Sequence, residues 1–240
     1  DAWESQMRHL AGNGFRTIAH DRRGHGRSTQ TFGGNDMHTY ADDLVQLIEH
    51  LDLQDAVLVG HSTGGGEAAL VAARLGTTRV RGVVLVSAVA PVMVQSPENP
   101  DGVPLAVLDG LRASVLKDRS QLFQDFAPTF YGADLPGATV NQGMKDTFWA
   151  QGMMAGLPAV HDCIEAFSQT DFSDALRKLT MPVLVIHGDA DHVVPFAATG
   201  KRSAEIAPNA TLKVYAGAPH AVPDIFRDRL NADLLAFAQA

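Results

Sequence analysis

Short runs of β-branched and other hydrophobic residues alternate along the chain with longer stretches in which hydrophobic positions recur at helical spacing. This alternation is typical of a mostly parallel sheet covered by helices on both faces, an α/β fold. Most of the short runs are continuously hydrophobic, as expected of strands that are buried on both faces. The predicted strands are Arg16 to His20, Ala56 to Gly60, Val80 to Val86, Pro182 to His187 and Thr211 to Tyr215.

The stretch between the first two predicted strands has the pattern of an amphipathic helix. Residues Thr39 to Leu51 place hydrophobic side chains at helical spacing. Asp42 and Asp43 lie near the N-terminal end, where negative charge stabilises a helix. We expect this helix to cross over the sheet, and we predict a second amphipathic helix from Asp224 onward.

The regular alternation stops between about residues 91 and 180, where proline, glycine and methionine are frequent. We interpret this segment as a helical cap inserted over the strand ends and not as a separate domain. Residues 1–240 then form a single domain, because a hydrophobic content of 45% is sufficient for one large core.

The negative net charge argues against nucleic acids and anionic membranes as partners. At a formal net charge of -8 and a pI near 5.6, the chain lacks the clustered Lys and Arg that a nucleic-acid or anionic-membrane surface needs. No hydrophobic run is long enough to span a bilayer. We therefore expect a cytoplasmic protein that acts on a small molecule, with no nucleic-acid or membrane partner, and leave a homo-oligomer open. Because the sequence starts at Asp1 and enters a helical pattern at once, we expect a preceding segment, and a signal peptide stays an open alternative.

The single cysteine, Cys163, excludes an intramolecular disulfide, and no CxxC spacing offers a zinc or haem site. We therefore expect no metal and no cofactor. A cysteine within a helical pattern is predicted to be buried and inert, with a reactive thiol as the alternative.

The segment Ala56 to Glu67 carries the strongest chemical signal. A hydrophobic run leads into Gly-His-Ser-Thr-Gly at residues 60–64, and small residues that begin a helix follow. This context is that of a nucleophile elbow, in which the glycines at positions 60 and 64 let the backbone turn sharply while Ser62 projects from it. We predict Ser62 as the nucleophile and the backbone N–H of Thr63 as an oxyanion donor at the helix N-terminus.

A serine nucleophile needs an imidazole to accept its proton and a carboxylate to orient that imidazole. In this arrangement the residues follow in the chain order Ser, acid, His. His220 lies in a tight turn after the last predicted strand, so we predict it as the general base. The loop after the preceding strand offers two carboxylates: Asp191, which lies further out and which we favour, and Asp189, which more naturally caps the turn. His187 and His192 precede the last strand and are less suited as the base.

Two other features each allow a structural and a functional interpretation. The loop Asp21 to Ser28 contains arginines and glycines, but its spacing matches no phosphate-binding motif. We predict a structural loop in which the arginines pair with Asp21 and hydrogen-bond the backbone. Met153 and Met154 fit equally the lining of a substrate pocket and ordinary packing of the cap.

Five segments together carry a family resemblance: residues 19–28, 60–67, 86–88, 187–195 and 217–220. They resemble the cofactor-free bacterial haloperoxidases, a family of the α/β-hydrolase fold also described as non-haem chloroperoxidases and aryl esterases. The resemblance covers essentially the whole chain. His-Ser-Thr-Gly-Gly-Gly-Glu at residues 61–67 is far more specific than the general elbow.

The resemblance implies an α/β-hydrolase fold, with a mostly parallel, doubly wound sheet and a helical cap, and a triad of Ser62, Asp191 and His220. It implies hydrolysis of small carboxylic esters or lactones through an acyl-enzyme. It also implies a side activity in which hydrogen peroxide replaces water and releases a peracid that oxidises halide without metal or haem. The partners it implies are thus a small ester, lactone or carboxylic acid, together with hydrogen peroxide.

The chain departs from the family at its start. In the family, a His-Gly-aromatic-Pro segment precedes the stretch that matches residues 1–3 and supplies the second oxyanion N–H. We therefore expect that three strands and this donor are missing from the sequence, one strand belonging between those that end near His20 and Gly60. The alternative to an active esterase is a catalytically impaired fragment or a non-catalytic binding module of the same fold. A haloalkane dehalogenase is disfavoured, because that chemistry needs a carboxylate where Ser62 stands.

Overall fold

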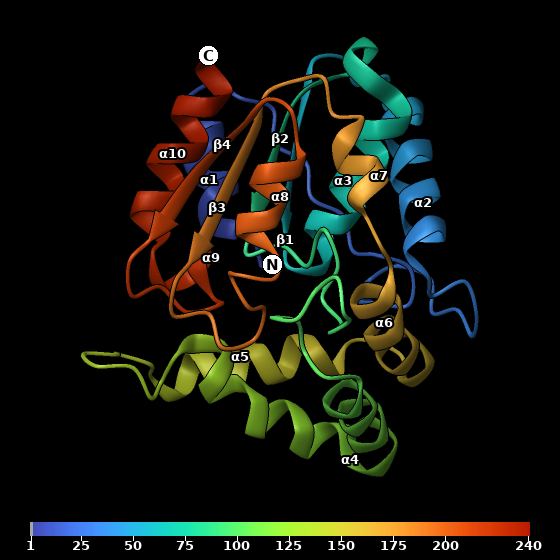
Figure 1. Cartoon of the computed structure of the whole chain (residues 1–240), viewed down its shortest axis with the longest axis vertical. Helices are drawn as coiled ribbons and strands as arrows, with labels where there is room; N and C mark the ends of the chain where they lie inside the picture. Colours follow the sequence, from blue (N-terminus) through green and yellow to red (C-terminus); the bar gives the residue numbers. More distant parts are fainter. Residues whose placement is uncertain (1) are drawn as a thin grey trace.

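Four parallel strands form one sheet in the order β1-β2-β3-β4 in the computed structural model, which describes residues 2–240 (Figure 1). Each strand pairs with its sequence neighbour in parallel register, so all four carboxyl ends meet at one edge of the sheet. The predicted α/β fold class is confirmed. The strands are β1 (Ala56–His61), β2 (Val80–Val86), β3 (Val183–Gly188) and β4 (Ala210–Tyr215), close to four of the five predicted runs.

The fifth predicted strand, Arg16 to His20, is wrong. This segment has no regular secondary structure, and no strand within residues 2–240 pairs with it. Ile18 is 42% exposed, although its hydrophobic neighbourhood suggested a buried strand. A hydrophobic run forms a strand only where a neighbouring strand satisfies its backbone N–H and C=O groups.

Helices cover both faces of the sheet, as a parallel sheet requires (Figure 1). Val83 and Leu85 of β2 belong to the core on one face, and Val84 and Val86 to the core on the other. The first face is covered by α2 (Met37–His50), α3 (Thr63–Leu75), α7 (Ser173–Arg177) and α8 (Gly200–Ile206), and the second by α1 (Glu4–Gly12), α9 (Val222–Ile225) and α10 (Arg227–Gln239). A short 3-10 helix, η1 (Gly76–Thr78), connects α3 to β2.

Three helices of the segment interpreted as a cap lie together across the carboxyl ends of the strands (Figure 1). They are α4 (Leu105–Tyr131), α5 (Gln142–Met153) and α6 (Leu157–Gln169). The cap is tied to the loop after β4, because the Ala221 N–H donates to the Phe130 carbonyl oxygen at 3.0 Å. The segment then returns to the sheet through α7, whose Leu176 is fully buried.

The predicted crossover helix is confirmed as α2, which begins at Met37 and ends at His50. Asp36 caps it, since its Oδ1 accepts the N–H groups of His38 and Thr39 at 3.0 and 2.9 Å. The C-terminal helix begins earlier than expected and is divided into α9 and α10 at Phe226. None of the helices in the described part of the chain is both long and apolar enough to cross a bilayer.

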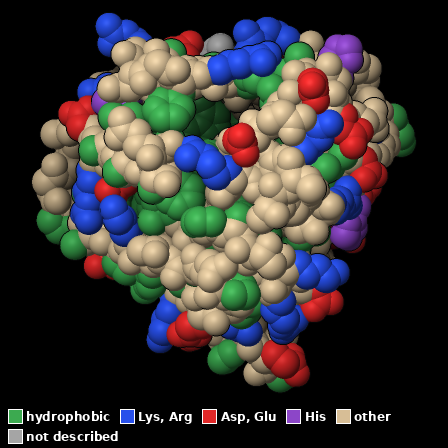
Figure 2. Space-filling model, turned by 90° about the horizontal axis from the view of Figure 1, so that it is seen from above, with side chains coloured by type: hydrophobic (Ala, Val, Ile, Leu, Met, Phe, Trp, Pro, Cys, Tyr) green, Lys and Arg blue, Asp and Glu red, His purple; other side chains and the backbone are tan. Residues whose placement is uncertain are grey.

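Figure 2 views the molecule from the end opposite the cap. On this face the Lys and Arg side chains are interspersed with Asp and Glu, and a hollow in the upper half of the view is lined in part by hydrophobic side chains.

Candidate active site

Ser62 lies at a sharp turn between β1, which ends at His61, and α3, which begins at Thr63. Its backbone has φ 54° and ψ -122°, a strained conformation for a residue other than glycine. The Ser62 N–H donates to the Val86 carbonyl oxygen at 3.0 Å, and its own carbonyl oxygen accepts the Val89 N–H at 3.2 Å. Both bonds fix the turn to the end of β2.

Of the two glycines predicted to be required for the elbow, Gly60 is confirmed and Gly64 is not. A Cβ on Gly60 would lie 2.1 Å from the Gly64 carbonyl oxygen, so position 60 requires glycine. A Cβ on Gly64, however, would meet nothing within 4 Å, which corrects the expectation that this glycine is needed for the turn. The second close approach is at Gly65, where a Cβ would lie 2.3 Å from the Cβ of Ala88.

The structure brings Ser62, His220 and Asp191 together from three loops at the carboxyl edge of the sheet. The Ser62 Oγ lies 3.0 Å from the His220 Nε2, and the His220 Nδ1 lies 2.8 Å from the Asp191 Oδ2. His220 is 1% exposed and Asp191 7% exposed, so the imidazole–carboxylate contact is shielded from water. This arrangement is the one that lets an imidazole accept a serine proton while a carboxylate fixes its tautomer.

The Asp191 carboxylate is held on both of its oxygens. Oδ1 accepts the backbone N–H groups of Val193 and Val194 at 2.9 and 2.8 Å, while Oδ2 faces His220. Burial alone would raise the pKa of Asp191, but the neighbouring imidazoles of His220 and His187 outweigh burial and hold that pKa far below its usual range. The carboxylate is therefore ionised wherever the protein is folded near neutral pH.

Asp189, the competing carboxylate, lies elsewhere. Its Oδ1 accepts the Gly217 N–H at 2.6 Å and so joins the loop after β3 to the loop after β4. Asp189 was expected to cap the turn of its own loop, but its carboxylate instead binds a backbone N–H of the loop after β4.

Two histidines that the sequence did not single out as functional also contact the triad. The His61 Nε2–H donates to the His220 carbonyl oxygen at 2.9 Å, and the two rings lie 4.7 Å apart. Burial and the nearby His220 lower the pKa of His61 to about 3, so His61 is neutral. His187 lies 3.3 Å from Asp191 through Nε2, whereas the exposed His192 points to Asp134. The position of His61 directly before Ser62 was a signal, but no sequence pattern shows which way its ring points.

Thr63 is the first residue of α3, where backbone N–H groups have no intrahelical acceptor. The positive end of the helix dipole adds to the attraction for negative charge there. The oxyanion role of the Thr63 N–H stays a prediction, and its place at the start of α3 is compatible with it.

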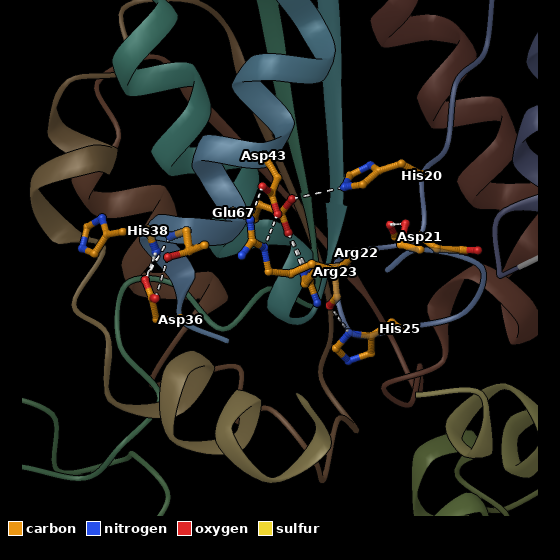
Figure 3. A network of polar contacts seen from close by, with 11 residues as sticks. His20, Asp21, Arg22, Arg23, His25, Asp36, His38, Asp43 and Glu67 are labelled. Carbon is orange, nitrogen blue, oxygen red and sulfur yellow. Dashed lines mark hydrogen bonds and ion pairs between the residues drawn. The ribbon is translucent and has the colours of Figure 1, made fainter. Parts of the chain in front are cut away.

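The loop Asp21 to Ser28 is held by ion pairs (Figure 3). Asp21 accepts the Arg27 backbone N–H and its Nε, at 2.9 and 2.8 Å, as expected for a structural loop. The expectation that the other arginines also pair with Asp21 is wrong. Arg23 pairs with Asp43 of α2. Arg22 reaches Glu67 of α3, and burial, which alone would raise the pKa of Glu67, is outweighed by Arg22 and His20, so that this pKa is lowered.

Aromatic rings of the cap lie against His220. The Phe130 ring lies edge-to-face with His220, with centroids 5.2 Å apart, and contacts Phe148 at 4.6 Å. Met154 is 47% exposed, so it is not buried in cap packing. Cys163 is buried, as predicted, and burial raises the pKa of its thiol.

The sheet order, the strained serine and the imidazole–carboxylate contact define an α/β hydrolase with serine at its elbow. The sequence matches the family model for the alpha/beta hydrolase fold over residues 1–224. The chain belongs to the α/β-hydrolase superfamily, in its group of non-heme chloroperoxidases and esterases, and the resemblance stated from the sequence is confirmed.

Three relatives illustrate the similarity. The chain is 52% identical over 241 residues to a non-heme chloroperoxidase of Streptomyces lividans and 50% identical over 241 residues to a bifunctional esterase/perhydrolase of Acinetobacter calcoaceticus. Each match covers 100% of this chain and 87% of the relative. Among solved structures, a bromoperoxidase from Bacillus anthracis superposes with a TM-score of 0.95 at 36% identity, covering 100% of this chain and 87% of that one.

Proposed function

We propose that this protein is a serine hydrolase that cleaves small carboxylic esters or lactones through an acyl-enzyme on Ser62. The observation that carries the proposal is the pair of contacts at 3.0 Å from Ser62 Oγ to His220 Nε2 and at 2.8 Å from His220 Nδ1 to Asp191 Oδ2. The positive φ of Ser62 supports it, because such strain is found where a functional side chain must be displayed.

In the acylation step, the Ser62 oxygen attacks the ester carbonyl carbon while His220 accepts the hydroxyl proton. Asp191 stabilises the imidazolium that forms. The carbonyl oxygen becomes an oxyanion, towards which the Thr63 N–H donates. Collapse of the tetrahedral intermediate breaks the bond to the alcohol oxygen, and His220 returns the proton to the leaving alcohol.

Deacylation repeats these steps with a second nucleophile. Water gives the carboxylic acid and restores the Ser62 hydroxyl. Hydrogen peroxide in its place gives a peracid, which oxidises a halide ion to hypohalous acid and is itself reduced to the carboxylic acid. The relatives named as chloroperoxidases and as an esterase/perhydrolase support this second route.

The aromatic rings beside His220 support esters with an apolar or aryl group as substrates. The Phe130 ring stands against His220, and it packs against Phe148 of α5. Such a wall contributes apolar contact and excludes water from the reacting carbonyl.

The test is hydrolysis of 4-nitrophenyl acetate by the 240-residue chain, with Ser62→Ala as control and circular dichroism to report folding. We expect turnover that is lost in Ser62→Ala. Addition of hydrogen peroxide with bromide should then give halogenation of an added phenol that also depends on Ser62. Folded protein whose ester hydrolysis is unchanged in Ser62→Ala would overturn the proposal.

The alternative, a non-catalytic module of the same fold, is not favoured, because a binding module has no need of a strained serine in contact with a buried imidazole. A serine-directed fluorophosphonate probe separates the two. Labelling of wild-type protein but not of Ser62→Ala supports the hydrolase, and no labelling of folded wild-type protein supports the module.

A further inference from the structure

His187 is a buried titratable group that the triad mechanism leaves unused. It lies in β3 directly before Gly188, and it is 0% exposed. Its Nε2 lies 3.0 Å from the Val194 carbonyl oxygen and 3.3 Å from Oδ2 of Asp191, the same oxygen that contacts His220. One imidazole nitrogen therefore faces both the carboxylate and the loop that carries it.

The surroundings of the ring fix its tautomer. Nε2 faces two oxygens that can only accept, so it carries the proton. Nδ1 is buried and has no hydrogen-bond partner among residues 2–240. It lies against the backbone of Gly200, where an added Cβ would come within 2.4 Å of it. The ring of Phe196 packs against it at a centroid distance of 5.6 Å.

The contacts of His187 also reach the other donors to Asp191. The Val194 N–H donates to Asp191 Oδ1 at 2.8 Å, while the Val194 carbonyl oxygen accepts from His187. His187 thus binds Val194, whose N–H binds the Asp191 carboxylate, and it also contacts that carboxylate directly.

We propose that His187 is a positioning residue for the catalytic carboxylate: its Nε2–H fixes Val194 and Asp191 so that Asp191 meets the His220 Nδ1 in one orientation. This inference rests on the proposed serine hydrolase function and deepens it. His187 touches no reacting atom and acts through Asp191.

The same contact tunes the base. A donor beside the carboxylate stabilises its negative charge and weakens its pull on the His220 proton. Without that donor, Asp191 favours protonated His220 more strongly, so the base is blocked up to a higher pH. The titratable groups that face this cluster are Asp191, His220 and His61, while Gly200 of α8 lies against the ring.

The test compares two variants in 4-nitrophenyl acetate hydrolysis. His187→Phe keeps a ring of similar shape and removes the donor, whereas His187→Gln keeps an N–H at similar reach. For His187→Phe we expect kcat to fall roughly ten- to a hundredfold, as for a lost hydrogen bond to a charged group, with little change in KM. The acid limb of its kcat/KM profile should move to higher pH. His187→Gln should recover most of kcat and the original acid limb.

The matched control is His192→Phe, because His192 directly follows Asp191 in the loop after β3 and its side chain is 53% exposed. It should leave kcat and the acid limb unchanged. A second measurement reads the tautomer directly: nitrogen NMR of labelled histidine in wild-type protein should show both His61 and His187 as the Nε2–H tautomer, and the signal that is lost in His187→Gln is that of His187.

The outcomes separate this inference from the proposed function. If Ser62→Ala abolishes hydrolysis but folded His187→Phe keeps wild-type kcat and acid limb, the positioning role is wrong and the hydrolase stands. A loss of thermal stability in His187→Phe with an unmoved acid limb likewise reduces His187 to a packing residue. If His187→Phe does not fold, an Nδ1–H tautomer in the wild-type spectrum overturns the inference and an Nε2–H tautomer supports it. If Ser62→Ala leaves ester hydrolysis unchanged, both the proposed serine hydrolase function and the positioning role of His187 are wrong.

Discussion

The Arg22 guanidinium binds the Glu67 carboxylate through two nitrogens, with Nε and Nη2 at 2.9 and 2.6 Å from Oε2 (Figure 3). Glu67 is 3% exposed and lies on α3, the helix that begins directly after Ser62. Arg22 belongs to the loop Asp21 to Ser28, and its Cζ lies 4.7 Å from the centroid of the Tyr40 ring. The pair therefore joins that loop to the helix of the nucleophile elbow.

Removal of one partner of this pair should cost much more than removal of both. Arg22→Met leaves a buried carboxylate without its partner, so the free energy of unfolding should fall by about 3 kcal/mol, whereas Arg22→Met with Glu67→Gln should recover most of that loss. Urea denaturation measures both. The control is Arg177→Met, whose pair with Asp174 is exposed and should contribute less than about 1 kcal/mol. Equal destabilisation by the single and double variants would contradict this account.

The neighbouring glycines of the elbow should respond in opposite ways. Gly65→Ala forces a Cβ against Ala88 and should lower the free energy of unfolding by about 1–3 kcal/mol through overpacking. Gly64→Ala enters open space in α3 and should be neutral or stabilising by up to about 1 kcal/mol, because alanine favours a helix. Thermal or urea unfolding of the two variants provides the comparison. If Gly64→Ala lowered the free energy of unfolding and Gly65→Ala did not, the assignment of the close backbone contact to position 65 would be wrong.

Asp191 should stabilise the folded protein near neutral pH, and this contribution to the free energy of unfolding should be lost as the pH falls. Its pKa is lowered in the folded state, so the unfolded chain, with a carboxyl pKa of about 3.9, binds the proton more readily. The stabilisation is therefore present above the unfolded pKa and is lost as the pH falls towards the folded pKa. Asp191→Asn removes this contribution, so its free energy of unfolding should decrease less than that of wild-type protein between about pH 5 and pH 3. Denaturation at several pH values tests this, and equal slopes for both proteins would refute it.

His61 should support His220, the proposed general base, through its hydrogen bond and not through a charge. Because its pKa is lowered to about 3, it stays neutral across the pH range in which the enzyme works. His61→Phe keeps the ring between Trp3 and Phe130 but leaves the His220 carbonyl oxygen without its donor. We expect kcat to fall about tenfold with KM little changed. His50→Phe, at an exposed position on α2, is the control, and an unchanged kcat in His61→Phe would contradict the positioning by His61.

Periodicity predicted four of the strands and the crossover helix because these elements bury hydrophobic side chains in a regular order. It was wrong at Arg16 to His20, where the side chains have strand character but no paired strand satisfies the backbone among residues 2–240. Strand formation depends on a partner, and a sequence window contains no information on whether one is present.

Motif spacing and chain order were sufficient to predict Ser62, Asp191 and His220 as candidates for one site. The roles of His61 and His187 could not be predicted, since each depends on where a ring nitrogen points. The choice of the critical glycine went wrong for the same reason: position 64 fits the motif, but the close approach to Ala88 at position 65 appears only in three dimensions.

The most direct test of the account is the intact mass of the 240-residue chain during reaction with 4-nitrophenyl acetate at acidic pH, where deacylation is slow. The account predicts a mass gain of one acetyl group, located on Ser62 by peptide sequencing and absent in Ser62→Ala. Ester turnover by folded protein without an acyl adduct on Ser62, or an adduct that persists in Ser62→Ala, would contradict the central claim that Ser62 is the nucleophile.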